Sequence, residues 1–282
     1  ENIIGVYCAP DKEGQKIDPL KEYALAQHLP VFQPASFKKP EVWEQLRSLK
    51  PDLGVMAYVT LFVPQEALNT PTHGTIQYHP SLLPWHKGPS SINWPIIFGE
   101  RKTGLSVFWP DNGLDTGPIL LQKEVEIGAD DTLGSLYFDQ LFPLGVEAML
   151  EAIDLVKAGR APKIPQDPKA GSYEGWCRAQ DVRIDWSKPQ RQVHDLIRGA
   201  NPQPGAWTFH AGKMLQIFDA VKLAGAGTPA PGEVLEINDQ GFNVATRDGP
   251  IQVLRVKPDD NKKMAAREYA RIGDLKVGDR LT

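Results

Sequence analysis

Apolar residues over the first 160 positions alternate between the spacing of strands and the spacing of helices. Pro19, directly after Asp18, opens a helix that extends to Gln27, and Pro40 opens a second with apolar side chains at i, i+4 and i+7. Short apolar runs predict strands at 2–8, 31–32, 53–58, 74–78, 105–109 and 119–125. This alternation predicts an α/β fold built on an open, largely parallel sheet.

Further along the chain the pattern changes. Helices are predicted from Ser90 to Phe98 and from Asp130 to Ala158, where Gly159 is a stop signal. Prolines at intervals of three within 160–171 predict a stiff, extended linker. After a helix at 190–198, short runs broken by Gly and Pro predict a small β-barrel or sandwich, with strands at 215–220, 234–237, 242–245 and 251–256. We therefore expect a first domain over 1–160, a linker over 161–179 and a β-barrel domain over 180–282.

Two loops of the first domain carry candidate chemistry. Ligands of open α/β sheets bind outside the carboxyl ends of the strands. After the strand ending at Tyr78, His79 begins a loop stiffened by two prolines, and after Trp109 a Gly-rich turn carries Asp115. An Asp there could orient the imidazole for acid–base work near neutral pH. From spacing alone a structural His, and an Asp that caps its own backbone, remain open alternatives.

Composition narrows the classes of function. The net charge is −4, with 35 acidic and 31 basic residues, which argues against general electrostatic binding of nucleic acid. Two distant cysteines make no disulfide framework, and no apolar run approaches the ~18 residues of a membrane helix. We expect a cytoplasmic protein without a membrane partner. No metal-ligand spacing links His73 or His86 to His79, so no metal is expected.

The segment 79–84, then Gly88, then 114–117 closely resembles the folate-dependent formyltransferases, and the resemblance spans nearly the whole chain. It implies a Rossmann-like formyltransferase fold, followed by a small OB-like barrel. It also implies 10-formyltetrahydrofolate as formyl donor, with no NAD. His79 and Asp115 fall on two positions of the family's catalytic trio. The folate-binding positions that it implies are Tyr58, Phe62, Val63, Pro64, Leu82, Leu83, Pro84, Gly88, Trp109, Asp111, Gly113, Leu114 and Gly117.

Within the family, the sequence is most similar to the hydrolase domain of 10-formyltetrahydrofolate dehydrogenase. The segments 10–14, 18–20 and 91–94 carry this likeness. The third catalytic position, two residues before His79, is Gln77 where a typical transferase has Asn. Its amide could donate to the formyl oxygen, or it could be a polar residue at a strand end. Family members usually begin with a strand and helix that precede the segment starting at Glu1, so we expect that part of the first domain to be missing.

Three functions compete. The first is transfer of the formyl group to water or to a small amine. The second is formylation of methionyl-tRNA, which is disfavoured because residues 200–282 carry 11 Lys and Arg against 10 Asp and Glu, a balance of only +1. The third is a folate-binding module without activity, against which the presence of both His79 and Asp115 argues. The sequence does not name the acceptor, the oligomeric state or the role of the C-terminal domain.

Overall fold

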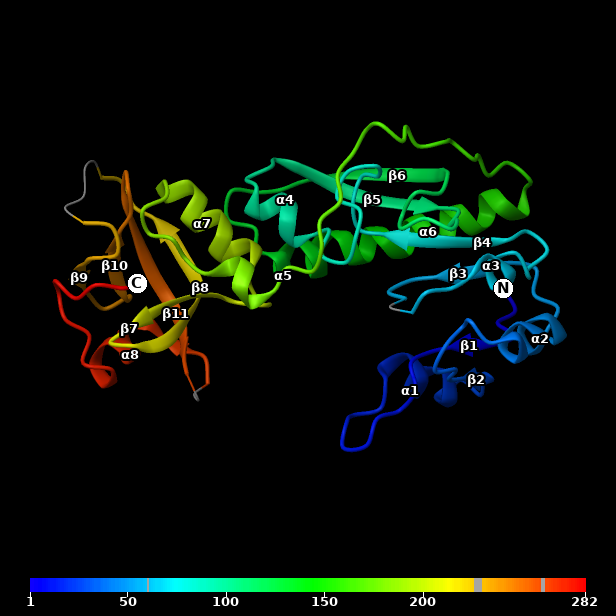
Figure 1. Ribbon diagram of the computed structural model, residues 1–282, viewed down its shortest axis with the longest axis horizontal. Helices are drawn as coiled ribbons and strands as arrows, with labels where there is room; N and C mark the ends of the chain where they lie inside the picture. The colour runs from blue at the N-terminus through cyan, green and yellow to red at the C-terminus, as the bar shows by residue number, and fades with distance from the viewer. Residues whose placement is uncertain (60, 226–229, 260–261) are drawn as a thin grey trace. The chain divides into compact units, whose positions relative to one another are not determined.

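The computed structural model describes residues 1–59, 61–225, 230–259 and 262–282 (Figure 1). Two compact units interleave along the chain. The first unit comprises residues 1–79, 106–121 and 148–168, and the second comprises 80–105, 122–147 and 169–282. The domain boundaries expected near residues 160 and 180 stay a prediction.

In the residues that the structure describes, the N-terminal half contains two sheets and several helices, which confirms the predicted α/β class. A two-stranded parallel sheet pairs β1 (Val6–Tyr7) with β2 (Val31–Phe32). A four-stranded sheet has the order β3-β4-β5-β6 (Figure 1). Its strand β3 is parallel to β4, whereas β4 is antiparallel to β5, so this sheet is mixed. Its strands are β3 (Gly54–Met56), β4 (Thr75–His79), β5 (Lys102–Phe108) and β6 (Ile119–Glu126).

The first two helices begin where the sequence predicts. Helix α1 (Pro19–Ala26) is capped by Asp18, whose Oδ1 accepts a hydrogen bond from the backbone N of Leu20 at 2.8 Å. Helix α2 (Pro40–Ser48) opens at its proline. The short helix α3 (Gln65–Leu68) was not predicted, because four residues are too few to show a helical period.

The later helices are shorter than expected. Helix α4 covers only Asn93–Ile97. The long helix expected from Asp130 is divided into α5 (Leu133–Ser135), a π-helical segment (Leu136–Leu141) and α6 (Phe142–Lys157). It starts later because Asp131 accepts from the backbone N of Gly128 at 2.7 Å and closes a turn there. The cap of α5 is therefore Thr132.

An antiparallel sheet with the order β7-β8-β11-β10-β9 forms the C-terminal part, and β12 pairs with β11 (Figure 1). In the described residues this order does not return from β9 to β7, so the OB-like barrel is not confirmed. Its core includes Trp186, Ile217, Phe242 and Val253. The elements are α7 (Gln190–Gly199), β7 (Ala206–His210), β8 (Lys213–Lys222), β9 (Val234–Ile237), β10 (Phe242–Ala245), β11 (Pro250–Pro258), β12 (Met264–Ala265) and α8 (Ala266–Ile272).

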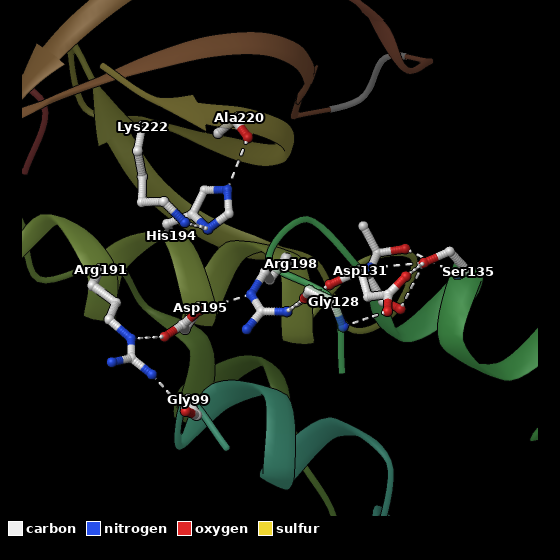
Figure 2. A network of polar contacts seen from close by, with 11 residues as sticks. Gly99, Gly128, Asp131, Ser135, Arg191, His194, Asp195, Arg198, Ala220 and Lys222 are labelled. Atoms are coloured by element: carbon white, nitrogen blue, oxygen red, sulfur yellow. Dashed lines mark hydrogen bonds and ion pairs between the residues drawn. The ribbon is translucent and has the colours of Figure 1, made fainter. Parts of the chain in front are cut away.

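Helix α7 carries a buried polar network within the second unit (Figure 2). Arg198 donates to Asp195 at 2.7 Å and to the carbonyl oxygens of Gly128 and Asp131 at 3.1 and 2.9 Å. Arg191 contacts the same carboxylate at 3.4 Å. Because both the Arg198 and the Asp195 side chains are buried, these bonds offset the cost of taking the two charges out of water.

His194 on the same helix is held as a neutral imidazole (Figure 2). Its Nε2 donates to the carbonyl oxygen of Ala220 at 3.1 Å, and Lys222 Nζ donates to its Nδ1 at 3.3 Å. Burial, and then the positive charges of Lys222 and Arg198, lower the pKa of His194 below its usual value.

This shift predicts a loss of stability on mild acidification. Because the pKa of His194 is lower in the folded than in the unfolded chain, the unfolded chain takes up the proton first as pH falls through about 6.5. The slope from one such group is at most about 1.4 kcal/mol per pH unit. We expect the urea concentration at the midpoint of unfolding to be lower at pH 5.5 than at pH 7.5. This decrease should be smaller in His194→Gln. The same change at the exposed His73 should leave the wild-type pH dependence in place; identical profiles for both variants would contradict the assignment.

Candidate active site

Strand β4 presents the first two candidate residues. Gln77 and His79 are two positions apart on this strand, so their side chains emerge on the same face of the sheet. Gln77 is paired with Phe108 and His79 with Ser106 on β5. The His79 side chain is buried, and its Nδ1 lies 3.7 Å from Oδ2 of Asp115, whose side chain is equally buried at 7 % exposure. This distance is within ion-pair range and longer than a strong hydrogen bond.

The turn that carries Asp115 is organised by its own side chains. Oδ1 of Asp111 accepts from the backbone N of Gly113 at 2.9 Å and from the Thr116 hydroxyl at 2.7 Å. Asp115 adopts the left-handed conformation with φ of 55°, which Asp tolerates better than most residues. A Cβ on Gly117 would lie 1.8 Å from the carbonyl oxygen of Trp109. The turn therefore requires glycine at position 117, and the carboxylate of Asp111 stabilises it.

The proline-rich linker is bound along this turn. Ile164 exchanges backbone hydrogen bonds with Ile119, at 2.9 and 2.8 Å. The indole Nε1 of Trp109 donates to the carbonyl oxygen of Pro162 at 2.9 Å. Gln166 Nε2 donates to the carbonyl oxygens of Asp115 and Gly117 at 2.9 and 2.7 Å. The spacing of the prolines predicts only a stiff spacer, and it carries no signal for these contacts.

A pocket of about 100 Å³ within the first unit is lined by Asp115, one member of the pair. Most of its lining residues are apolar, and Gln77, Asp111 and Asp115 supply polar groups. Phe62 and Leu114, which both line it, are each 55 % exposed. The pocket is lined by Met56, Val59, Leu61, Phe62, Val63, Leu68, Gln77, Phe108, Pro110, Asp111, Gly113, Leu114 and Asp115.

The structure brings together some of the predicted folate-binding residues. Phe62, Val63, Asp111, Gly113 and Leu114 line the pocket together with Gln77 and Asp115. Of the other pocket-lining residues, Met56 and Phe108 end β3 and β5. The rule that ligands bind at strand ends would have found these two.

The other predicted positions are not among the residues that line this pocket. Tyr58 is 91 % exposed, Pro64 precedes helix α3, and Trp109 is buried against the linker. Gly117 is a structural requirement of the turn. The predicted loop residues Leu82, Leu83, Pro84 and Gly88 belong to the second unit, where Gln122 donates to the carbonyl oxygen of Leu83 at 2.8 Å. The folate-binding roles of all these residues stay predictions.

Metal-binding clusters and membrane-spanning helices are both absent from the part of the chain that the structure describes. No group of three or more His, Cys, Asp or Glu side chains is arranged to hold a metal ion there. None of the described helices is both long enough and apolar enough to cross a membrane.

A buried His–Asp pair at a strand end of an α/β fold, with the Asp lining a pocket, is typical of an enzyme that uses acid–base chemistry. Comparison with known proteins gives the family. Residues 2–153 match the family described as Formyl transferase, and residues 177–272 match Formyl transferase, C-terminal domain. The chain belongs to the formyl transferase family.

Two relatives and two solved structures illustrate the likeness. Mitochondrial 10-formyltetrahydrofolate dehydrogenase of Homo sapiens is 39% identical over 98% of this chain, which spans about a third (31%) of that protein's length. Methionyl-tRNA formyltransferase of Ruminiclostridium cellulolyticum is 37% identical over 99% of this chain and 92% of that protein. HypX from Aquifex aeolicus, in complex with tetrahydrofolic acid, has a TM-score of 0.68 at 23% identity, over 90% of this chain and 44% of its own. An N-formyltransferase from Helicobacter canadensis has a TM-score of 0.63 at 20% sequence identity, over 88% of this chain and 88% of its own. These last two show a shared fold.

Proposed function

We propose that this chain binds 10-formyltetrahydrofolate and transfers its formyl group to water, or to a small amine. The buried His79–Asp115 pair, 3.7 Å apart at the end of β4, carries this proposal. It has support from the family and from the dehydrogenases, which are named for 10-formyltetrahydrofolate and match nearly the whole chain.

The pocket fits one end of such a donor. Apolar side chains from the end of β3 and from the segment 59–68 form walls suited to a flat conjugated ring. The exposed Phe62 and Leu114 offer apolar surface that a bound ring would cover. Polar groups at Gln77, Asp111 and Asp115 then give the ring or its formyl group a fixed orientation.

The reaction proceeds by addition and elimination. The oxygen of water attacks the formyl carbon, the carbonyl electron pair moves to oxygen, and an oxyanion forms. When the electron pair returns, the bond from carbon to the folate nitrogen breaks. Of the two protons that the attacking water gives up, one is taken by that nitrogen and the other is released to solvent, so the products are formate, tetrahydrofolate and H⁺. His79 stabilises the oxyanion or protonates the leaving nitrogen, and Asp115 orients His79 and orders the water.

Gln77 is the proposed donor to the oxyanion. Its place two residues before His79, on the same strand face, puts its amide at the pocket wall. Removing one such donor typically costs about 10²–10³-fold in kcat. We expect Gln77→Leu to lose activity on this scale, with KM for the donor nearly unchanged, in steady-state assays of tetrahydrofolate release. Gln45→Leu, on the exposed face of α2, is the control, and wild-type kcat in Gln77→Leu would leave Gln77 a polar residue at a strand end.

The deciding assay mixes the protein with 10-formyltetrahydrofolate and follows release of tetrahydrofolate. Steady release without an acceptor supports hydrolysis, and release only after addition of an amine supports transfer. If the donor binds but no acceptor is formylated, the chain is a folate-binding module and the proposed activity is wrong.

Methionyl-tRNA is the second candidate acceptor. It is favoured by the match over 92% of the length of the Ruminiclostridium methionyl-tRNA formyltransferase. Residues 200–282 are nearly neutral, with 11 basic and 10 acidic side chains, which argues against electrostatic binding of tRNA phosphates by this part of the chain. Formylation of methionyl-tRNA at a rate above hydrolysis would make this the main function.

A further inference from the structure

Gln166 makes two hydrogen bonds to the turn that carries Asp115. Its Nε2 donates to the carbonyl oxygen of Asp115 at 2.9 Å and to that of Gly117 at 2.7 Å. A primary amide has two N–H groups on one nitrogen, so both are used here. The linker thereby holds the backbone on both sides of Thr116.

The orientation of this amide is set by the turn alone. Oε1 of Gln166 is buried and has no hydrogen-bond partner among the residues that the structure describes. Leaving a buried acceptor unpaired is unfavourable, so Oε1 contributes nothing that would hold the amide in this position. The two carbonyl oxygens of the turn determine which way it faces.

The backbone near Gln166 is anchored at both flanks of the turn. Two residues earlier, Ile164 pairs with Ile119, which follows the turn. Four residues earlier, the carbonyl oxygen of Pro162 accepts from the indole of Trp109, which precedes the turn. All of these residues lie in the same compact unit. The Gln166 side chain therefore extends from a fixed base.

The turn needs such support because Asp115 has φ of 55°, in the left-handed region. We propose that Gln166 is a positioning residue, which holds the Asp115 backbone so that its carboxylate faces His79. This inference rests on the formyl-transfer function proposed above. Gln166 acts through the backbone of Asp115 and is not assigned a contact with the substrate.

The sharpest variant is Gln166→Glu, which keeps the size of the side chain. A carboxylate has only acceptors, so it faces the two carbonyl oxygens with repulsion in place of two bonds. Gln190 offers a matched control, because its Nε2 also donates to two carbonyl oxygens, those of Leu223 at 2.8 Å and Pro250 at 2.6 Å. Gln190→Glu makes the same chemical change in the C-terminal part.

We expect kcat of Gln166→Glu at pH 8 to fall at least tenfold per folded molecule, while Gln190→Glu keeps wild-type kcat even if it lowers the melting temperature. Protonation of the introduced carboxylate at lower pH restores one O–H donor. The ratio of variant to wild-type kcat should therefore rise from pH 8 to pH 6. Gln166→Ala, which removes the bonds without repulsion, should lose activity with a ratio that does not change with pH. Wild-type kcat in Gln166→Glu, or an equal loss in Gln190→Glu, would overturn the proposal.

A second readout separates this proposal from the proposed function. Amide hydrogen exchange in peptides covering 110–118 should be faster in both Gln166 variants than in wild type and in Gln190→Glu. If the wild-type protein transfers no formyl group, the proposed function fails, and exchange still decides whether Gln166 holds the turn. Unchanged exchange in both Gln166 variants overturns the positioning role.

Discussion

Replacing His79 by Ala is expected to abolish formyl transfer while the protein stays folded. The imidazole is the group at the site that can exchange a proton near neutral pH, and a positioned acid or base contributes about 10²–10⁴-fold to a rate. Truncation at the end of β4 leaves the pairing with Ser106 intact, because that pairing is made by the backbone. We expect kcat for tetrahydrofolate release to fall by about 10³-fold or more, with an unchanged circular dichroism spectrum.

A second substitution separates the two roles proposed for His79. Gln at this position keeps an N–H donor but cannot transfer a proton at neutral pH. If His79 mainly stabilises the oxyanion, His79→Gln retains part of the activity that His79→Ala loses. If it protonates the leaving nitrogen, both variants are equally inactive. The exposed His73, in the turn before β4, is the control, and wild-type kcat in His79→Ala would refute the assignment.

Helices and strands were predictable where capping residues, prolines or short apolar runs mark their bounds in the sequence. Asp18 and Pro19 predicted the start of α1, and the short apolar runs predicted β2, β9 and β10 with the observed bounds. The late start of the long helix expected from Asp130 was not predicted, because the Gly128–Asp131 hydrogen bond competes with helix formation and leaves no periodic signal. Nor does sequence periodicity reveal whether the C-terminal sheet closes.

The candidate site was predictable only in part for a similar reason. The rule of strand ends placed His79 and Asp115 near one another, and the structure brings them to 3.7 Å. The contact of Gln166 with the turn was not predictable, because it depends on a linker that returns to the turn about 50 residues along the chain. Contacts between such distant residues follow from the tertiary fold, which local pattern does not encode.

Asp115→Asn is expected to remove most of the activity without loss of stability. The amide has the shape of the carboxylate, and Asn is among the residues that adopt the left-handed conformation readily, so the φ of 55° at this position is retained. The carboxylate 3.7 Å from His79 Nδ1 is lost, and with it the group that we propose orients the imidazole and orders the water. We expect kcat to fall by about 10²-fold or more in the tetrahydrofolate assay, with a wild-type urea midpoint.

Comparison with Asp115→Ala separates the effect of losing the carboxylate from the effect of straining the backbone. Ala in the left-handed region is strained by about 1–2 kcal/mol, so this variant should lose stability as well as activity. If both variants lose activity to the same extent while only Ala lowers the urea midpoint, the carboxylate itself is what catalysis requires. Full activity in Asp115→Asn would instead show that position 115 requires only a residue that adopts the left-handed backbone conformation of the turn between Gly113 and Gly117. The buried pair would then be a structural contact, and His79 would act without an orienting partner.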